Sequence, residues 1–432
     1  MNFLKKLFSP LFLAVSLFLL GYIFYKSEFF WNGERQIFYF KYYVFSFLLI
    51  ISSIISFFLS QKIKEYLIIS AISLLLGIYL VESFLIYKAY KLQNLRKDVY
   101  EKETGKKFDT RSPLEIYKDL KKKDDKITIA FHPSFYIDKN LDFLSLSGIS
   151  HSETIYCNES GYISTYLSDR YGFNNPDADW DKKEIEYLLV GDSFTHGACV
   201  NRPNDIASVL RSLSKKSVIN LGYKGNGPLI EYASLREYLR ANVQKVLWIY
   251  YEGNDLENLK REKNHKILKK YLEDLTFTQN LKSRQSEINL ILNNYILNEK
   301  NKADIDYLKK LFNFLKFYNL RNLIISLQEK TPNFVELKKI IQLANDLSNK
   351  NNSKMYFVYL PTYQRYITDY NNENYASVKK LIKNLNIPFI DIKSELFDKE
   401  DNPLTLFPFR VEGHYTEDGY KRISEIIWKN TK

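Results

Sequence analysis

The stretch IEYLLVGDSFTHG, residues 185–197, decides how this chain is expected to fold. Its first six residues are mostly apolar, a short run of the kind found in parallel strands buried on both faces. The run ends at Gly191, and Asp192, Ser193 and His196 follow at once. A serine directly after such a strand is either the nucleophile of an active site or a polar residue that caps the next helix. This stretch alone leaves both readings open.

Downstream of this stretch, predicted strands alternate with predicted helices. Short apolar runs predict the strands, and apolar residues at i, i+3 and i+4 predict the helices. The strands are expected at 217–223, 244–251, 354–361 and 387–392, and the helices at 228–240, 374–385 and 415–430. This order predicts an α/β fold of three layers, α/β/α, with a parallel sheet covered by helices on both faces. The ligand site of such a sheet lies beyond the carboxyl ends of its strands.

Three further stretches surround this alternating pattern. Residues 126–137 alternate like a strand, and residues 161–180 are rich in turn formers and aromatic residues. A long Lys- and Leu-rich helical insertion is expected at about 256–350. The insertion is either a lid or docking surface for an anionic polymer, or a solvated pair of helices.

Three apolar runs near the amino terminus begin at Pro10, Ile37 and Tyr66. A membrane span needs about 20 apolar residues, and the second and third runs meet this with one interior charge each, Lys41 and Glu82. The first run is shorter and could be the apolar part of a signal peptide, but no small-residue cleavage site follows it. We therefore expect three transmembrane helices. The predicted divisions are a membrane region at 1–92, a stalk and lead-in segment at 93–150, and the α/β domain at 151–432.

The orientation of these helices is predicted from basic residues. Lys5 and Lys6 before the first helix, with Lys62 and Lys64 before the third, favour a cytoplasmic amino terminus. Three crossings then place everything after Tyr90 outside the cytoplasm. The basic residues after the third helix favour the opposite orientation, and they are Lys88, Lys91, Arg96 and Lys97. We expect a multi-pass protein of the inner or plasma membrane with an extracytoplasmic α/β domain.

The two cysteines bear on the same question. Cys157 and Cys199 flank the predicted strand that precedes Ser193. A disulfide between them would suit an oxidising compartment. Two unrelated small core residues would give the same sequence, so both readings stay open.

The chain is basic, with 62 Lys and Arg against 50 Asp and Glu and a formal net charge of +12. The positive residues are spread out, and no RNA-binding or helix-turn-helix signature accompanies them, so no nucleic-acid partner is expected. A membrane surface or an anionic polymer suits the charge better. Compositional drift in an AT-rich genome would also produce it.

An attacking serine needs a base, a group that orients the base, and donors for the oxyanion. Of the five histidines, His414 follows the last predicted strand and is the candidate base. Glu412, two residues earlier, is a carboxylate that could hold the imidazole. Asn254 follows the third strand, where its amide could donate to an oxyanion. A glycine-rich loop after the second strand offers backbone N–H donors, and its glycines are Gly222, Gly225 and Gly227.

These pieces together resemble the SGNH, or GDSL, hydrolase superfamily. The four matching blocks are GDSFTHG at 191–197, NLGYKG at 220–225, EGND at 252–255 and EGHYTEDGY at 412–420. The upstream SDRYGFNNPD at 168–177 is similar to a membrane-attached branch of the superfamily. The resemblance implies Ser193 as nucleophile, His414 as base, and Gly225 and Asn254 as oxyanion donors.

The resemblance has one departure. The family usually has Asp two or three residues before the histidine, where this chain has Glu412 and Val411. Glutamate can still accept from the imidazole, so Glu412 is the expected third member. Asp192 is expected to support the local turn, and Asp255 to have a similar role beside Asn254.

Three functions agree with these residues. The first is a serine esterase that removes O-acyl groups from a cell-surface glycan. The second is an O-acyltransferase that modifies such a glycan, with a partner protein in the membrane to supply the acyl group. The third is a non-catalytic glycan-binding module. The chain has no HExxH motif and no EF-hand loop, so neither a metal nor a cofactor is expected.

Overall fold

The computed structural model describes most of the chain and divides it into two compact units. The first unit comprises Met1–Ala89 with Leu308–Gln328, and the second comprises Tyr90–Tyr307 with Glu329–Lys432. The residues described are 2–33, 35–133, 143–302, 306–328, 334–367, 370 and 373–432.

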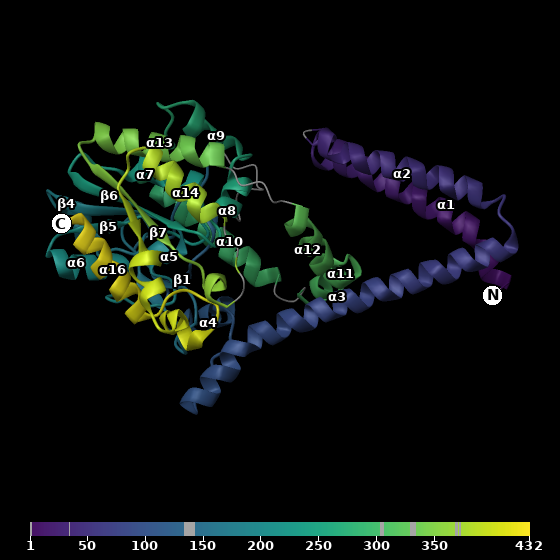
Figure 1. Ribbon diagram of the computed structural model, residues 1–432, viewed down its shortest axis with the longest axis horizontal. Helices are drawn as coiled ribbons and strands as arrows, with labels where there is room; N and C mark the ends of the chain where they lie inside the picture. Colours follow the sequence, from purple (N-terminus) through teal and green to yellow (C-terminus); the bar gives the residue numbers. More distant parts are fainter. Residues whose placement is uncertain are drawn as a thin grey trace. The chain divides into compact units, whose positions relative to one another are not determined.

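The first unit contains three helices that are long and apolar enough to cross a membrane, as predicted. They are α1 (Asn2–Phe24) with the π-helical turn η1 (Tyr25–Phe30), α2 (Gln36–Ser56) and α3 (Gln61–Thr104), of which the residues up to Ala89 belong to this unit. Figure 1 shows α1 and α2 side by side, and Ser9 Oγ donates to the carbonyl of Ser56 at 3.0 Å. Many large apolar side chains on these helices are exposed, which is expected of surfaces that face lipid.

The second unit is built around the predicted parallel sheet. Its strands lie in the order β5-β4-β6-β7-β8, and all neighbouring pairs are parallel. The strands are β4 (Ile185–Gly191), β5 (Val218–Asn220), β6 (Val243–Tyr251), β7 (Lys354–Leu360) and β8 (Phe389–Asp391). Because all five run the same way, their carboxyl ends lie along one edge of the sheet.

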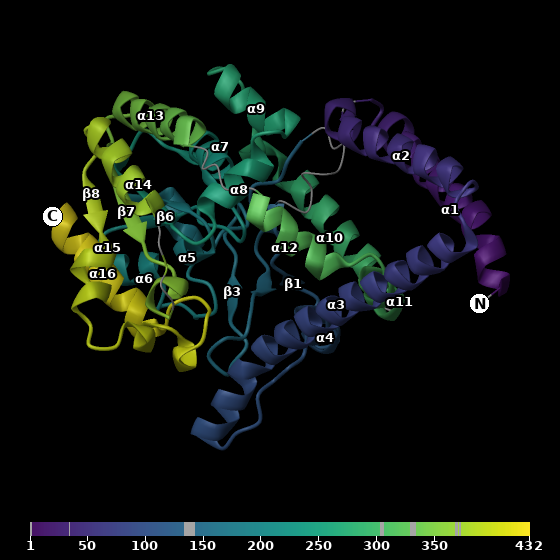
Figure 2. The same cartoon turned by 45° about the vertical axis from the view of Figure 1, so that its right-hand side comes forward.

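Helices cover both faces of this sheet, which confirms the predicted three-layer arrangement (Figures 1 and 2). Alternate residues of β4 enter different cores: Leu188 joins one buried cluster and Leu189 the other. The first cluster includes residues of α7 (Pro228–Tyr238) and α13 (Phe334–Lys350). The second includes residues of α6 (Ile206–Ser214) and α16 (Glu417–Thr431). Full burial of a large apolar side chain contributes about 1.5–3 kcal/mol, which explains the continuous apolar runs.

A small three-stranded sheet precedes the main one and was not predicted in full. Its strands are β1 (Ile127–Ile129), β2 (Glu153–Ile155) and β3 (Thr165–Leu167), in the order β1-β2-β3. The predicted strand at 126–137 is thus limited to β1 among the described residues, and residues 134–137 lie outside them. Ahead of it, α4 (Pro113–Leu120) starts with a capping box between Ser112 and Glu115.

The predicted insertion is mostly helical where it is described, with a non-helical stretch at 274–280. Its helices are α8 (Asp255–Glu262), α9 (Lys266–Glu273), α10 (Gln285–Lys302), α11 (Asp306–Leu315) and α12 (Tyr318–Gln328), followed by α13. Residues 308–328 group with the first unit, whereas the rest of the insertion groups with the second. The remaining short elements are α5 (Ser193–His196), α14 (Glu373–Asn384), α15 (Ile392–Glu395) and the 3-10 turns η3 (Asp177–Asp181), η4 (Leu281–Arg284), η6 (Tyr363–Tyr366), η7 (Phe397–Lys399), η8 (Pro403–Leu406) and η9 (Pro408–Arg410).

Candidate active site

Ser193 lies at the carboxyl end of β4, where it is the first residue of α5. The residue that caps α5 is Asp192, whose Oδ1 accepts a hydrogen bond from Phe194 N at 2.8 Å. The turn is tight: a Cβ at Gly191 would stand 2.0 Å from Thr195 Oγ1. Ser193 therefore stands at the edge of the sheet where the strands end. Because α5 has only four residues, the helix itself contributes little to stability.

His414 brings its ring to this hydroxyl from the loop before α16. Ser193 Oγ and His414 Nε2 are 2.9 Å apart, although 221 residues separate them in the chain. The ring also lies 4.6 Å from that of Phe194, measured between centroids. The expected serine and histidine are therefore neighbours.

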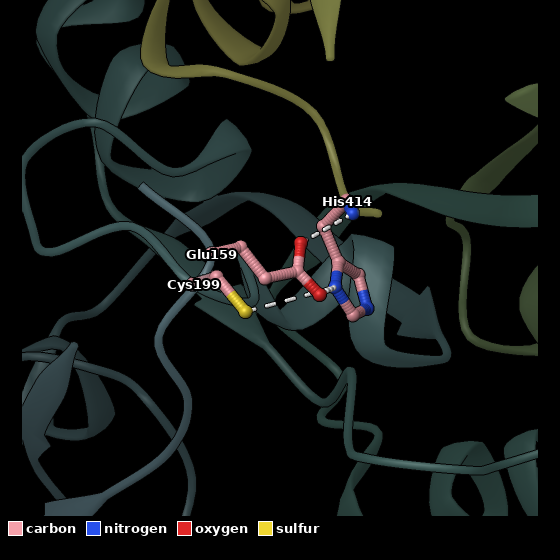
Figure 3. Close-up of side chains that lie close together, drawn as sticks. All are labelled: Glu159, Cys199 and His414. Atoms are coloured by element: carbon pink, nitrogen blue, oxygen red, sulfur yellow. Dashed lines mark hydrogen bonds and ion pairs between the residues drawn. The ribbon is translucent and has the colours of Figure 1, made fainter. Parts of the chain in front are cut away.

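The carboxylate at the other ring nitrogen belongs to Glu159, in the segment between β2 and β3 (Figure 3). Glu159 Oε1 lies 3.1 Å from His414 Nδ1, and Glu159 Oε2 accepts a hydrogen bond from His414 N at 2.6 Å. The structure thus gives Glu159 the position that was expected for Glu412. Glu412 has an exposed side chain, and its main-chain carbonyl accepts from Arg96. Glu159 thus contacts His414 twice, through the backbone N–H and through the ring nitrogen opposite the one that faces Ser193.

The electrostatics of Glu159 favour its ionised form. Burial alone would raise its pKa, but the charge and hydrogen bonds of His414 and the charge of Arg96 outweigh burial and lower the pKa to about 2. Arg96 Nη1 lies 3.7 Å from Glu159 Oε1, and it comes from the last part of α3. An ionised carboxylate can only accept, so His414 Nδ1 carries a proton and Nε2 is free to accept the Ser193 proton.

Gly413 leaves room for this arrangement. A Cβ on Gly413 would stand 2.6 Å from both Arg96 Nη2 and Glu159 Oε2. Any larger residue would therefore displace the carboxylate or the guanidinium that surround His414.

A disulfide holds the Glu159 segment beside the Ser193 turn. Cys157 and Cys199 are bonded, with their Cα atoms 5.2 Å apart, so the pairing left open by the sequence is present. Cys199 Sγ also lies 3.7 Å from His414 Nδ1 (Figure 3). Ligand atoms of Glu159, Cys199 and His414 gather within 4.8 Å of one another. Because that sulfur belongs to the disulfide, it offers no thiolate to a metal.

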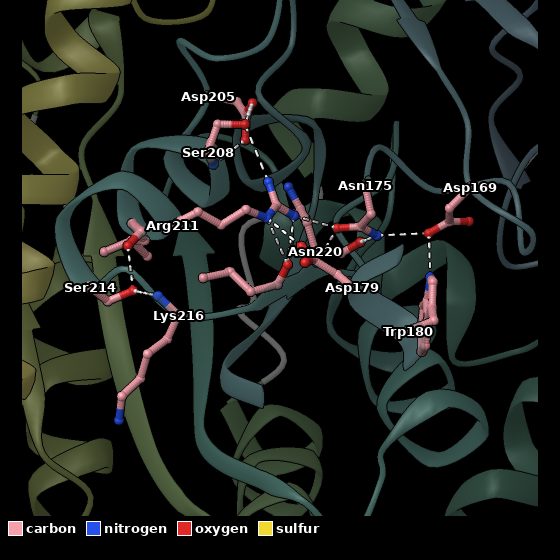
Figure 4. Close-up of polar contacts among 12 residues, drawn as sticks. Asp169, Asn175, Asp179, Trp180, Asp205, Ser208, Arg211, Ser214, Lys216 and Asn220 are labelled. Carbon is pink, nitrogen blue, oxygen red and sulfur yellow. Dashed lines mark hydrogen bonds and ion pairs between the residues drawn. The ribbon is translucent and has the colours of Figure 1, made fainter. Parts of the chain in front are cut away.

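A buried network of hydrogen bonds links the turn-rich segment at 169–180 to the turn that carries Ser193 (Figure 4). Asp169 Oδ2 accepts from Asn175 Nδ2 at 2.8 Å and from Trp180 Nε1 at 2.7 Å. Asn175 Oδ1 accepts from Asn220 N at 2.8 Å, and Asn220 Nδ2 donates to the Thr195 carbonyl at 2.7 Å. This chain of bonds ties β5 to the turn that carries Ser193.

Asn254 lies just after β6, and its side chain contacts the residue before Ser193. Asn254 Nδ2 donates to Asp192 Oδ2 at 3.2 Å. An amide nitrogen has two hydrogens, so one remains for another acceptor. Asp255 Oδ2 in turn accepts from Tyr251 N at 2.9 Å and supports the strand-end turn. Asp192 and Asp255 thus make the local contacts that were expected of them.

Several carboxyl groups lie buried together behind Asn254. Burial raises the pKa of Asp192. The pKa of Asp255 is raised well above its usual range, mainly by burial and in second place by the negative charge of Asp192. The pKa of Glu231 is likewise raised, mainly by burial and in second place by the negative charge of Asp255. Burial and the neighbouring negative charges thus both disfavour the ionised form of these carboxyl groups.

Gly225 stands in the loop between β5 and α7 and has a φ of +73°. A Cβ here would stand 1.7 Å from His132 Nδ1, so the His132 ring lies directly against this glycine. Burial, with the charges of Lys224 and Arg261, lowers the pKa of His132 to about 4 and favours a neutral ring. The loop is held by Glu262, whose Oε1 accepts from Gly227 N at 2.6 Å.

His196 lies only three residues after Ser193, and its surroundings explain why it cannot serve as the base. Its ring stacks on Tyr156 with centroids 4.4 Å apart, and its Nδ1 lies 3.3 Å from the Gly222 carbonyl. Burial lowers the pKa of His196 to about 3. The ring is thus part of the packing beneath the turn.

Reasoning from the sequence missed Glu159, Arg96 and His132. None of them lies in a block that follows a strand of the main sheet. One signal pointed toward Glu159: Cys157 lies two residues before it, and the disulfide partner Cys199 lies six residues after Ser193.

Comparisons with known proteins found no matching family model and no matching curated protein. Among solved structures, the chain is similar to a lipolytic protein of the G-D-S-L family from Desulfitobacterium hafniense DCB-2, at 16% identity and a TM-score of 0.34. That match covers 57% of this chain and 99% of the other. An acetyl xylan esterase matches at 15% identity and a TM-score of 0.34, over 57% of this chain and 98% of the other. At TM-scores this low, neither likeness carries an argument about this chain.

Proposed function

We propose that this chain is a membrane-anchored serine esterase of the SGNH type that cleaves O-acyl groups from a cell-surface glycan. The observation that carries the proposal is the line from Ser193 Oγ through His414 to Glu159, with separations of 2.9 and 3.1 Å. A hydroxyl, an imidazole and an ionised carboxylate in this order are the machinery of acyl transfer.

In the proposed reaction, Ser193 Oγ attacks the acyl carbonyl carbon while His414 Nε2 takes the hydroxyl proton. The C–O bond to the alcohol then breaks, and His414 returns the proton to the leaving oxygen. This leaves an acyl ester on Ser193. Water attacks that ester with His414 again as base, which releases the acid and restores the serine.

Three donors are proposed for the oxyanion: the N–H groups of Ser193 and Gly225 and the amide of Asn254. Asp192 supports this assignment because its bond to Asn254 fixes one amide hydrogen and leaves the other for the substrate. Glu159 holds the imidazole tautomer and balances the charge on His414 after proton transfer.

The glycan substrate is inferred from location. Three helices able to cross a membrane precede the catalytic unit, so the enzyme would work at a membrane surface. The Cys157–Cys199 disulfide supports an extracytoplasmic site, because such bonds persist in oxidising compartments. Alkaline phosphatase fused after Lys432 should therefore be active in a bacterial host; an inactive but intact fusion would place the domain in the cytoplasm.

The first test uses the full chain in detergent with p-nitrophenyl acetate, comparing wild type with Ser193→Ala. Steady release of p-nitrophenol that is lost in the variant is the expected result. A single-turnover burst followed by a stall would instead indicate an acyl-enzyme that waits for a glycan hydroxyl, and hence the transferase. Equal rates for both proteins would contradict the proposed nucleophile.

A further inference from the structure

The helices α11 (Asp306–Leu315) and α12 (Tyr318–Gln328), called here the α11–α12 pair, belong to the insertion but contact α3 (Figures 1 and 2). The ring of Tyr79 on α3 lies 5.1 Å from that of Phe314 and 4.7 Å from that of Phe317. The pair thus packs on the helix that also supplies the third candidate membrane span.

A buried acid anchors this contact. Glu82 on α3 has no exposed surface. Its Oε1 accepts from Asn319 N at 3.0 Å and from Asn319 Nδ2 at 2.8 Å, and its Oε2 accepts from Leu320 N at 2.9 Å. These donors belong to the first turn of α12, where the backbone N–H groups have no partner within the helix and favour a negative charge.

The position of Glu82 fixes the depth of the contact. Glu82 lies in the apolar part of α3, six residues before Lys88, which is about 9 Å along a helix. If α3 spans a bilayer, the α11–α12 pair therefore meets α3 near the boundary between acyl chains and headgroups. A carboxylate at that depth is costly unless it is paired, and α12 supplies the pairing.

The outer surface of the pair is apolar with basic residues between. Phe312 is 54% exposed, close to the 61% of Leu76 on α3. Further exposed apolar residues of the pair are Leu311, Leu315, Tyr318 and Ile324, and its exposed basic residues include Lys316 and Arg321. Aromatic and aliphatic side chains mixed with long basic ones are typical of helices that lie in a membrane interface.

We propose that the α11–α12 pair is a second membrane attachment, which lies in the lipid interface against α3 and is held there by Glu82. The exposed apolar surface of the pair contacts the lipid bilayer. Because the chain leaves the second unit at Tyr307 and re-enters it at Glu329, the pair gives that unit a second connection to the membrane region, in addition to the one through α3. The proposal rests on α3 spanning the bilayer and is independent of any esterase activity.

The test places a fluorophore on single introduced cysteines of the full chain, without reductant, in phospholipid nanodiscs. The labelled variants are Phe312→Cys on the pair, Leu76→Cys on α3 as the lipid-facing control, and Leu275→Cys as the control outside the first unit. Leu275 is a matched control because it is apolar and 65% exposed. Lipids with a spin label on the acyl chain then quench any fluorophore that touches them.

We expect the label at position 312 to be quenched at least about twofold more than the label at 275, and comparably to the label at 76. Quenching at 312 no stronger than at 275 would overturn the proposal. The same result would be seen if a second protein, and not lipid, covered the pair. In a Glu82→Gln background, quenching at 312 should fall while quenching at 76 stays constant. Unchanged quenching at 312 would refute the role of Glu82.

Discussion

The two sides of His414 are built by different parts of the chain. On the Nε2 side stands Ser193, at the end of a strand in a five-stranded parallel sheet. On the Nδ1 side stands Glu159, in a loop of the small lead-in sheet, tied down by a disulfide and accompanied by Arg96 from α3. The position of Ser193 can be predicted from the sequence, because parallel strands end at the same edge of a sheet. The position of Glu159 depends on contacts between segments that are far apart in the sequence, and no spacing pattern predicts these contacts.

The largest expected effect concerns the Nε2 side. Ser193→Ala should lower kcat/KM for p-nitrophenyl acetate by about 10⁴-fold or more, because the covalent route is lost. Thermal unfolding should change little, since the hydroxyl's main contact is His414. Labelling by a fluorophosphonate probe checks the same point, and a Ser193→Ala protein that still reacted with the probe would contradict the assignment.

The second prediction sets Glu159 against Glu412. Glu159→Gln should lower kcat about 10²–10⁴-fold, because a neutral amide no longer holds the tautomer or balances the imidazolium. Glu412→Gln, the matched control, should stay within about threefold of wild type because its side chain is exposed. The measurement is kcat for both variants. A larger loss of kcat in Glu412→Gln than in Glu159→Gln would contradict the prediction and favour Glu412 as the carboxylate that acts on His414.

The third prediction concerns the oxyanion. Asn254→Ala should lower kcat by about 10²–10³-fold with a small change in KM, since the lost donor acts on charge that develops in the transition state. Asp192→Asn should have a smaller effect, because Asp192 acts through Asn254 and through its cap on Phe194. A change confined to KM for Asn254→Ala would mean that the amide binds substrate and does not stabilise the oxyanion.

The smallest expected effect concerns Arg96. Arg96→Gln removes one of the positive charges that lower the pKa of Glu159, so the pKa of this carboxyl group should rise above its wild-type value of about 2. The loss of activity at acid pH that follows protonation of Glu159 should then begin at a higher pH in the variant than in the wild type. A kcat/KM profile extended into the acid range measures this shift.

Arg96→Lys serves as the control because it keeps the charge while losing the forked geometry. Its profile should stay close to that of the wild type. If both variants shift the profile equally, the effect of Arg96 lies in packing against Gly413 and not in its charge.

Much of the fold was predictable because burial on both faces makes each core strand a continuous apolar run. The stretches around β4 and β6 are examples, and the residues after them, Ser193 and Asn254, follow from the rule that parallel strands end at one edge. The small sheet was harder to predict, because its three-residue strands leave too short a pattern to detect. The carboxylate beside His414 was not predicted for a related reason: Glu412 is close to His414 in the chain, whereas Glu159 is close to it in space.

The sequence by itself determined the α/β class, the three long apolar helices and the meeting of Ser193 with His414, because these depend on periodicity and on strand order. The tertiary structure alone decided which carboxylate reaches His414, since 255 residues separate the two and a disulfide brings Glu159 into place. It also decided that α12 caps Glu82, a contact across 237 residues. Such contacts depend on where separate segments pack, and local hydrophobic patterns do not encode that.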